Sequence, residues 1–378
     1  MSILVQKKDL YEAMQKAIPV VPNKSSLLIL SNFKINYADS IMEISATDAD
    51  HSLRVVAAAS GDGQLDITVN ARKVFDLVKE LPEGEIKLSA DGLVLIIETK
   101  VGFYKIAGAD SGDFPGIPAI ADGVELEIGS FALRDMIQKS SFAAAKDESR
   151  SSLCGILWEL SSDKAGMVAT DGHRLGYSFI GMDLPLKDSI AKIISQKSVQ
   201  TLMKITDSKS QDEKLKVMIG DKYVSFSTPL FTMVSKLVEG QYPEYNKVIP
   251  KNNPKVIVAD RIAMLDAVRR VSVFANQKNR LIKMVFNQGT VEISAVNKEY
   301  GSESREVVEI QYSGEEHTVG FNGQFLPEIL GIVGTKNIRM EMNTSVSACL
   351  IFPEYNDEKD KISDDLFLQM PLRIMDEI

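Results

Sequence analysis

The sequence contains few of the residues on which metal sites and disulfide frameworks depend, and it lacks long apolar runs. Its 378 residues include two cysteines and three histidines. Cys154 and Cys349 lie 195 residues apart without a CxxC spacing, so we expect no disulfide framework, no zinc site and no other cofactor. No apolar run reaches the roughly 18 residues that a membrane-spanning helix needs, and residues 1–10 lack the order of a signal peptide. We therefore expect a cytoplasmic protein without a membrane partner.

The sequence is also short of basic residues. It has 43 Lys and Arg against 52 Asp and Glu, a net charge of −9, which taken alone argues against a nucleic-acid-binding protein of the ordinary basic kind. It lacks a GxSxG motif, a Cys adjacent to a His and a phosphate-binding GxxxxGK motif. With 44% hydrophobic and 25% charged residues, the composition is that of a folded globular protein.

One local plan, a helix followed by alternating strands, occurs three times. Apolar residues recur at three- and four-residue spacing in 8–14, 130–137 and 260–268, which predicts an amphipathic helix in each segment. Strand patterns that end in a small polar turn follow at 41–48, 166–171 and 290–297. Second helices are expected at 71–80, 196–205 and 324–333. The turn residues Asp48, Asp171 and Asn297 lie 123 and 126 residues apart, so the sequence predicts an internal triplication.

Aromatic-proline segments at 113–116 and 241–244 mark where one copy gives way to the next. They place three domains at residues 1–122, 123–252 and 253–378. Each domain is expected to be an α+β unit, with two helices packed on antiparallel sheets of about eight short strands.

Three motifs occur in an order that resembles the bacterial DNA polymerase III β subunit family, the sliding clamps. They are ATDGHRL at 169–175, SKLVEGQYPEY at 235–245 and MPLRI at 370–374, and the resemblance covers essentially the whole chain. It implies a DNA clamp fold and a ring-forming, head-to-tail homodimer around duplex DNA. By the same resemblance, Tyr104 and Ile106 of the first domain would meet Val273 and Phe274 of the third domain of a second chain.

A ring of this kind would place the helices around a common hole. The segments 7–17, 71–80, 131–146, 192–204, 260–280 and 321–336 together carry +10, so the rest of the chain carries −19. A positive lining inside an acidic shell would attract a phosphate backbone without reading its sequence. The residues expected to contact double-stranded DNA in this way are Lys24, Arg72, Lys73, Lys146, Arg150, Lys192 and Lys197.

The resemblance also implies a groove between the second and third domains that captures short peptides. Its clients would be the DNA polymerase III α subunit, the clamp loader, repair polymerases and other proteins that carry a clamp-binding peptide. Arg174 and Arg373 are expected at the rim, Lys247 replaces a common Arg, and the tail 375–378 could cover part of the groove. The matching positions are Leu153, Thr170, Gly172, His173, Arg174, Leu175, Pro243, Lys247, Val248, Phe325, Val346, Ala348, Leu368, Met370, Pro371, Leu372 and Arg373.

Two other functions compete with this interpretation. Asp171 and His173 could form the acid–base pair of a hydrolase. Against this, residues 170–172 are typical of a turn in which the Asp binds its own backbone and Gly172 takes a positive φ. The chain could also be a structural three-domain scaffold. We expect a non-catalytic processivity subunit with a binding surface, and no active site, at this turn.

Overall fold

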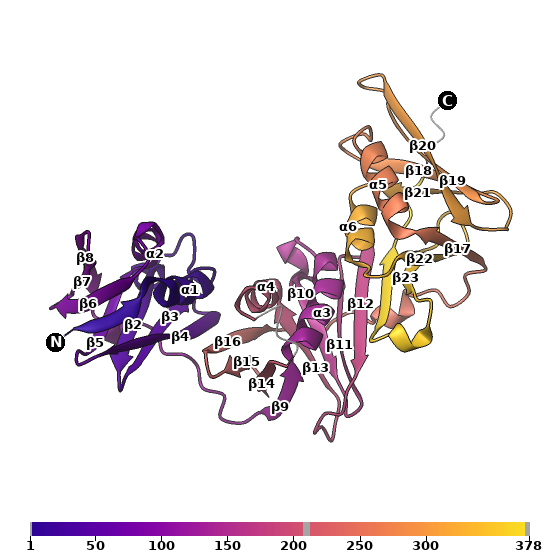
Figure 1. The fold of residues 1–378 in the computed structure, drawn as a ribbon. Helices are drawn as coiled ribbons and strands as arrows, with labels where there is room; N and C mark the ends of the chain where they lie inside the picture. Colours follow the sequence, from indigo (N-terminus) through magenta and orange to yellow (C-terminus); the bar gives the residue numbers. More distant parts are fainter. Residues whose placement is uncertain (1, 207–211, 375–378) are drawn as a thin grey trace. The chain divides into compact units, whose positions relative to one another are not determined.

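The computed structural model in Figure 1 describes residues 2–206 and 212–374. These residues contain six α-helices, each of which begins within one residue of a predicted start. None of these helices is long and apolar enough to cross a membrane. The helices are α1 (Lys7–Ala17), α2 (Ala71–Glu80), α3 (Ser130–Ser140), α4 (Gln196–Ile205), α5 (Arg261–Ser272) and α6 (Phe325–Ile332).

Several helices end earlier than the segments used in the predicted charge count. Helix α3 ends at Ser140, whose hydroxyl donates to the carbonyl of Met136 at 2.7 Å and so satisfies a carbonyl of the last turn. Residues 190–195 form strand β13 and not the start of a helix. The β-branched side chains of Ile190, Ile193 and Ile194 favour a strand there.

Among the described residues each third of the chain contributes eight strands, as the sequence predicts, and every described pairing is antiparallel. The first third provides β1 (Ile3–Gln6), β2 (Asn32–Ala38), β3 (Ile41–Thr47), β4 (His51–Gly61), β5 (Leu65–Asn70), β6 (Glu85–Asp91), β7 (Val94–Glu98) and β8 (Phe103–Ala109). The second provides β9 (Val124–Gly129), β10 (Gly155–Leu160), β11 (Lys164–Thr170), β12 (Arg174–Gly181), β13 (Ile190–Ser195), β14 (Lys214–Ile219), β15 (Tyr223–Thr228) and β16 (Phe231–Val238). The last provides β17 (Lys255–Asp260), β18 (Leu281–Asn287), β19 (Thr290–Asn297), β20 (Ser302–Gln311), β21 (His317–Asn322), β22 (Asn337–Met342), β23 (Cys349–Glu354) and β24 (Asp364–Gln369).

The described chain divides into two compact units. The first holds residues 2–133, 197–206 and 212–237, and the second holds residues 134–196 and 238–374. Each unit contains a strand pair that joins neighbouring thirds of the sequence. In the first unit β16 pairs with β4, with Phe231 opposite Val55, and in the second β12 pairs with β24, with Leu175 opposite Leu368. The predicted boundaries at 122 and 252 stay predictions.

The helices bury the apolar faces that the sequence predicts. In the first unit Leu10 and Met14 of α1 are fully buried, and Tyr11 stacks on Phe75 of α2 with 5.5 Å between ring centroids. In the second unit Val268 of α5 is fully buried in a core formed with α6 and strands of the last third. Such burial contributes roughly 1.5–3 kcal/mol for each large aliphatic side chain.

Candidate functional site

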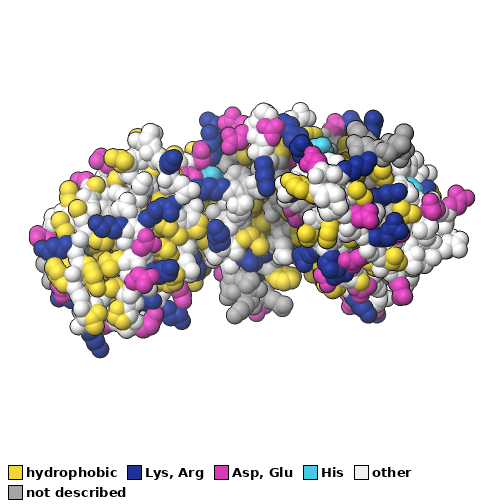
Figure 2. All heavy atoms as spheres, turned by 90° about the horizontal axis from the view of Figure 1, so that it is seen from above, with side chains coloured by type: hydrophobic (Ala, Val, Ile, Leu, Met, Phe, Trp, Pro, Cys, Tyr) yellow, Lys and Arg dark blue, Asp and Glu magenta, His cyan; other side chains and the backbone are white. Residues whose placement is uncertain are grey.

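The helices carry a net positive charge that is smaller than predicted. They contain thirteen Lys or Arg and seven Asp or Glu, a net charge of +6, which leaves −15 for the rest of the sequence. The value of +10 was too high mainly because Lys146, Lys192, Lys278, Arg280 and Lys336 lie outside the helices. On the face drawn in Figure 2, Lys and Arg side chains are interspersed with acidic ones.

Three of the predicted DNA-binding residues lie close together in the first unit. Arg72 and Lys73 are exposed in the first turn of α2, where Asn70 caps the helix by accepting from the amide of Lys73 at 3.0 Å. The guanidinium of Arg72 donates to the side chain of Asn23 at 2.5 Å, which brings the exposed Lys24 beside it. Lys24, Arg72 and Lys73 form a small basic patch. The sequence does not reveal this patch, because Lys24 and Arg72 are 48 residues apart.

Lys146, Arg150 and Lys192 lie in the second unit, and none of them is on an α-helix. Lys146 is exposed in a loop, and Lys192 is half-buried in β13 opposite Trp158. Arg150 lies in a short 3-10 segment and donates to the carbonyl of Asp171 at 3.0 Å. Arg150 therefore supports the turn that begins at Thr170 as well as presenting a charge.

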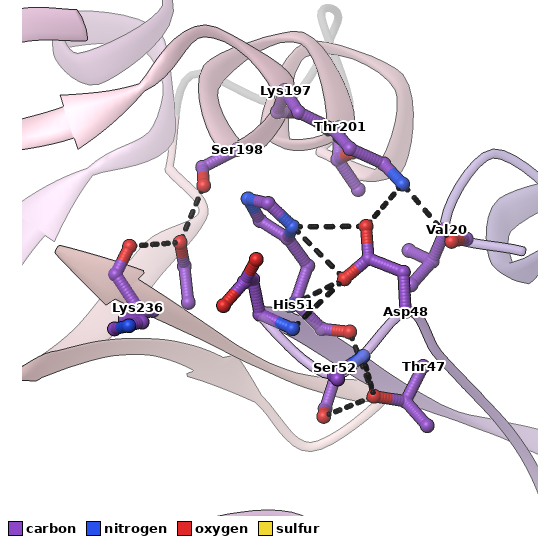
Figure 3. Close-up of polar contacts among 12 residues, drawn as sticks. Val20, Thr47, Asp48, His51, Ser52, Lys197, Ser198, Thr201 and Lys236 are labelled. Atoms are coloured by element: carbon purple, nitrogen blue, oxygen red, sulfur yellow. Dashed lines mark hydrogen bonds and ion pairs between the residues drawn. The ribbon is translucent and has the colours of Figure 1, made fainter. Parts of the chain in front are cut away.

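Lys197 is held by a polar cluster within the first unit. Its ammonium lies 2.5 Å from Oδ2 of Asp48 and donates to the carbonyl of Val20 at 3.1 Å. The imidazole of His51 lies 3.1 Å from the same carboxylate, and Figure 3 shows both side chains converging on Asp48. Burial alone would raise the pKa of Asp48, but hydrogen bonds from His51 and Lys197 outweigh it and hold this pKa well below its usual range. Lys197 is therefore committed to Asp48.

The turn from Thr170 to Arg174 is organised by hydrogen bonds to its own backbone. Oδ1 of Asp171 accepts from the amides of His173 at 2.9 Å and Arg174 at 3.0 Å, and Gly172 has a φ of +89°. Thr170 Oγ1 donates to the carbonyl of Arg174 at 2.7 Å. Among the described residues no contact joins the exposed imidazole of His173 to the carboxylate of Asp171. The geometry is that of the predicted turn and does not favour the hydrolase.

The first third contains the same turn with a different basic residue. Oδ1 of Asp48 accepts from the amides of Asp50 at 3.1 Å and His51 at 2.7 Å, and Thr47 Oγ1 donates to the carbonyl of His51 at 3.0 Å. Ala49 has a φ of +83°, the conformation that Gly172 takes in the second copy. His51 thus occupies the place of Arg174, and each contacts the Asp of its own turn.

The prediction that Arg174 lies at the rim of the peptide groove is wrong. Its side chain is 6% exposed and makes ion pairs with Asp171 at 3.1 Å and with Glu328 of α6 at 2.5 Å. The guanidinium also lies 4.2 Å from the ring centroid of Phe325 and 5.4 Å from that of Phe142. Arg174 therefore links the central third of the sequence to the last third through contacts of its buried side chain. Arg373, in contrast, is exposed as expected.

All seventeen predicted groove residues lie in the second unit, and hydrogen bonds bring together three of the segments that carry them, 170–175, 242–248 and 368–373. The amide of Met370 donates to the carbonyl of His173 at 2.7 Å, and the amide of Thr170 donates to the hydroxyl of Tyr242 at 3.0 Å. Leu153, Leu175, Ala348 and Leu368 belong to one buried cluster. Exposed positions are Gly172, His173, Pro243, Lys247, Val248, Val346, Met370 and Arg373, and half-buried ones are Thr170, Phe325, Pro371 and Leu372. Residues 375–378 lie outside the described residues.

A cavity of about 510 Å³ opens beside these segments. Pro243 and Lys247 line it, together with residues that the sequence did not point to, of which Leu157 and Ile193 are apolar. Tyr242 and Tyr245 also line it, and both belong to the 235–245 motif. The alternation of β10 and β13 could have indicated that Leu157 and Ile193 share the face of the buried cluster.

The predicted dimer residues lie near two open strand edges. β8 pairs with β7, and with β5 only at Gly108 and Ala109, so within the described chain 103–107 have an unpaired edge. Ile106 is 3% exposed, which limits it to main-chain contacts, and Tyr104 is half-buried. Val273 and Phe274, beyond α5, are 80% and 40% exposed.

The second open edge was missed by the sequence reasoning. β20 pairs with β19, and with β17 only at Ile310 and Gln311, which leaves 302–309 unpaired on one side among the described residues. Val307 on this strand is 62% exposed. An apolar residue facing solvent on an edge strand is the signal that could have indicated an interface.

Comparison with known proteins connects the whole chain to one family. Residues 1–118 match the N-terminal domain of the DNA polymerase III beta subunit, residues 127–244 its central domain and residues 246–365 its C-terminal domain. The chain is 30% identical to the beta sliding clamp of Pseudomonas aeruginosa, over 99% of this chain and 100% of the relative, and 29% identical to that of Escherichia coli K12 with the same coverage.

Solved structures give the same result for the fold. A Pseudomonas aeruginosa sliding clamp bound to griselimycin has a TM-score of 0.91 at 28% identity, covering 99% of this chain and 100% of that one. The Thermotoga maritima DNA polymerase III beta subunit has a TM-score of 0.89 at 26% identity, covering 99% of each chain. The predicted three-domain clamp fold of α+β units is confirmed.

Proposed function

Because this chain belongs to the DNA polymerase III beta subunit family, the non-catalytic sliding clamps of DNA replication, we propose that two copies close into a ring around duplex DNA and tether the replicative polymerase. The observation that carries the proposal is the match of three consecutive domain models along the chain, at residues 1–118, 127–244 and 246–365. A ring that encloses DNA topologically needs no tight contact with it, so it raises processivity without chemistry of its own.

The charge distribution supports a sequence-independent contact with DNA. A net charge of +6 on the helices against −15 elsewhere favours phosphates near the helices and repels them from the rest of the surface. The basic patch of Lys24, Arg72 and Lys73 is the strongest local candidate because all three side chains are exposed and the bond between Arg72 and Asn23 brings their segments together. Contacts of this kind hold the duplex without fixing a register, which is what sliding requires.

The open strand edges support a head-to-tail homodimer. An unpaired edge at 103–107 in the first unit and another at 302–309 in the second offer main-chain donors and acceptors to a second chain. Exposed Val273 and Phe274 would add apolar burial to such a contact. Two different surfaces that meet in this way form a heterologous contact, and two copies close it into a ring.

The groove in the second unit supports peptide capture. Leu175 and Leu368 belong to the buried apolar cluster of this unit, and Met370 and Val346 are exposed as adaptable apolar contacts. We propose that the α subunit of DNA polymerase III, the clamp loader and repair polymerases bind here through short peptides, in the cytoplasm where the DNA is replicated. Arg373 is exposed and available for peptide carboxylates, whereas the exposed Lys247 pairs with Glu244.

A loading experiment tests the proposal. Sedimentation should first give twice the chain mass of 41.7 kDa. After loading by a bacterial clamp loader onto a nicked plasmid, the protein should co-elute with the DNA in about 1 M NaCl, where phosphate contacts are screened. Cutting the plasmid once should release it, because a ring slides off a linear end. A monomer that the cut does not release would contradict the proposal.

A further inference from the structure

A row of side chains leads from the predicted groove along one face of β12; it is buried at Leu175 and Phe179 and half-buried at Tyr177. Leu175, Tyr177 and Phe179 are two residues apart and so lie on one face of the strand. On the neighbouring strand β24, Leu368 lies opposite Leu175 and Asp364 lies opposite Phe179. The row begins at a predicted groove position and ends about 13 Å away, at a rise of about 3.3 Å per residue.

The far end of this row opens into a second cavity of about 380 Å³. It shares Glu159, Ala191, Tyr245 and Asn246 with the 510 Å³ cavity that Pro243 and Lys247 line. The two cavities therefore share wall residues, and two of the predicted groove residues, Pro243 and Lys247, line the first of them. The other residues that line the second cavity are Leu160, Ser161, Lys164, Tyr177, Phe179, Ser189 and Ile190.

The second cavity combines aromatic walls with a carboxylate. The rings of Tyr177 and Phe179 lie 4.5 Å apart between centroids, and those of Tyr177 and Tyr245 lie 6.1 Å apart. The hydroxyl of Tyr245 donates to Oε2 of Glu159 at 2.5 Å, which fixes the carboxylate in the wall. Burial, together with the charges of Asp364 and Glu159, raises the pKa of Tyr177, so its phenol stays neutral.

The carboxylate of Glu159 forms no ion pair with any described residue. Within residues 2–206 and 212–374, no Lys, Arg or His nitrogen lies within ion-pair distance of its half-buried carboxylate. The one basic residue among those that line the cavity, Lys164, places its ammonium 5.3 Å from the ring centroid of Phe179. The cavity therefore already holds the ammonium of Lys164 against the ring of Phe179. The carboxylate of Glu159 is available to a second cation.

We propose that this cavity binds a lysine or arginine side chain of a client peptide, at a position flanking the segment held in the groove. A carboxylate backed by aromatic rings is complementary to an ammonium or guanidinium, and a cation there would replace water around Glu159. About four residues of extended peptide cover the distance from Leu175 to Phe179. The inference rests on the proposed function, because it needs a peptide in the groove.

Peptide binding with a scanned flank tests this inference. The probe is a fluorescein-labelled peptide from the clamp-binding segment of a DNA polymerase III α subunit, extended by six residues at either end. A single Lys is placed at each flanking position in turn and compared with norleucine, which keeps the chain length and removes the charge. One position should bind about threefold to tenfold more tightly with Lys. Glu159→Gln should abolish this difference, and Glu316→Gln, which removes an exposed charge in a loop of the same unit, should leave it intact.

If Glu159→Gln is poorly folded, a variant with the opposite charge at this position still tests the inference. Glu159→Lys should prefer a Glu flank over a Lys flank at the same position. If Lys and norleucine peptides bind equally at every position while the unextended peptide binds well, the inference is overturned and the proposed function stands. If the unextended peptide does not bind either, peptide capture in the groove fails and the inference falls with it. A free amine, n-butylamine, that shows the Glu159 dependence without any flank effect would also overturn it.

Discussion

Arg174 of β12 and Glu328 of α6 form an ion pair in which Nη1 and Oε2 are 2.5 Å apart. The partners lie 154 residues apart in the sequence and in different domain models of the family, so the pair holds the central and C-terminal thirds together. Because Arg174 also pairs with Asp171 and lies over two aromatic rings, its loss would leave carboxylates unpaired and rings without a partner.

We therefore expect Arg174→Ala to destabilise the second unit by about 3–5 kcal/mol. Urea unfolding of the protein, followed by tryptophan fluorescence of Trp158, measures this effect, because Trp158 is the single tryptophan and is 1% exposed in the same unit. Arg373→Ala is the matched control and should leave the unfolding midpoint unchanged while weakening peptide binding. Unchanged stability in Arg174→Ala, with peptide binding lost, would show that Arg174 contacts the peptide directly.

Asp48 should make the first unit sensitive to acid. Its pKa is held below its unfolded value of about 3.9, so its ionised form stabilises the fold. This contribution is complete above about pH 4 and is lost as the pH falls from there towards the folded-state pKa. Asp48→Asn should lower stability at pH 7 by about 2 kcal/mol and flatten the dependence below pH 4. Thermal unfolding from pH 2.5 to 7, with the neighbouring exposed Asp50→Asn as control, measures both effects.

Lys73 and Lys197 should behave differently although both were predicted to bind DNA. Lys73 is exposed in the first turn of α2, whereas Lys197 is committed to Asp48. Lys73→Gln should weaken binding to a short duplex at low salt and reduce the slope of log K against log salt by about one. Lys197→Gln should leave that slope unchanged and lower the unfolding midpoint. Equal slopes for wild type and Lys73→Gln would show that Lys73 does not contact the DNA.

Val273 and Val248 provide a matched pair for separating dimerisation from peptide capture. They are 80% and 58% exposed, so neither substitution should disturb a core. Val273→Glu should raise the dimer dissociation constant at least tenfold, since an unpaired charge would be buried at the interface (about 1.4 kcal/mol or more). Val248→Glu should weaken peptide binding and leave the dimer intact. Sedimentation velocity and fluorescence anisotropy read the two effects, and a dimer insensitive to Val273→Glu would exclude this surface.

Local sequence patterns predicted the secondary structure better than they predicted the contacts. Helix α2 spans Ala71–Glu80 as predicted, because its apolar period and the Asn70 cap are local signals. The charge count extended the segments of α3 and α5 too far, to residues 146 and 280, since basic residues beyond a helix are compatible with it but do not require it. Lys192 was assigned to a helix although the isoleucines around it favour a strand.

The peptide groove shows the same division. Its predicted members come from the resemblance and its motifs, which could not tell an exposed arginine from a buried one. Arg174 is buried because Glu328 and Phe325 arrive from a helix that lies more than 150 residues later. The sequence also could not show that Glu159 accepts a hydrogen bond from Tyr245 and forms no ion pair among the described residues, since both depend on three-dimensional neighbours.

The sequence by itself determined the triplication, the positions at which helices begin, the alternation of the strands and the polar turns at Asp48 and Asp171. These features depend on residues within one or two turns of each other, and short-range sterics and hydrogen bonding decide them. Only the tertiary structure decided that β4 pairs with β16 and β12 with β24, that Lys197 binds Asp48, and which strand edges stay open. Strand pairing and ion pairing join residues far apart in the chain, and many alternative partners share the same local pattern.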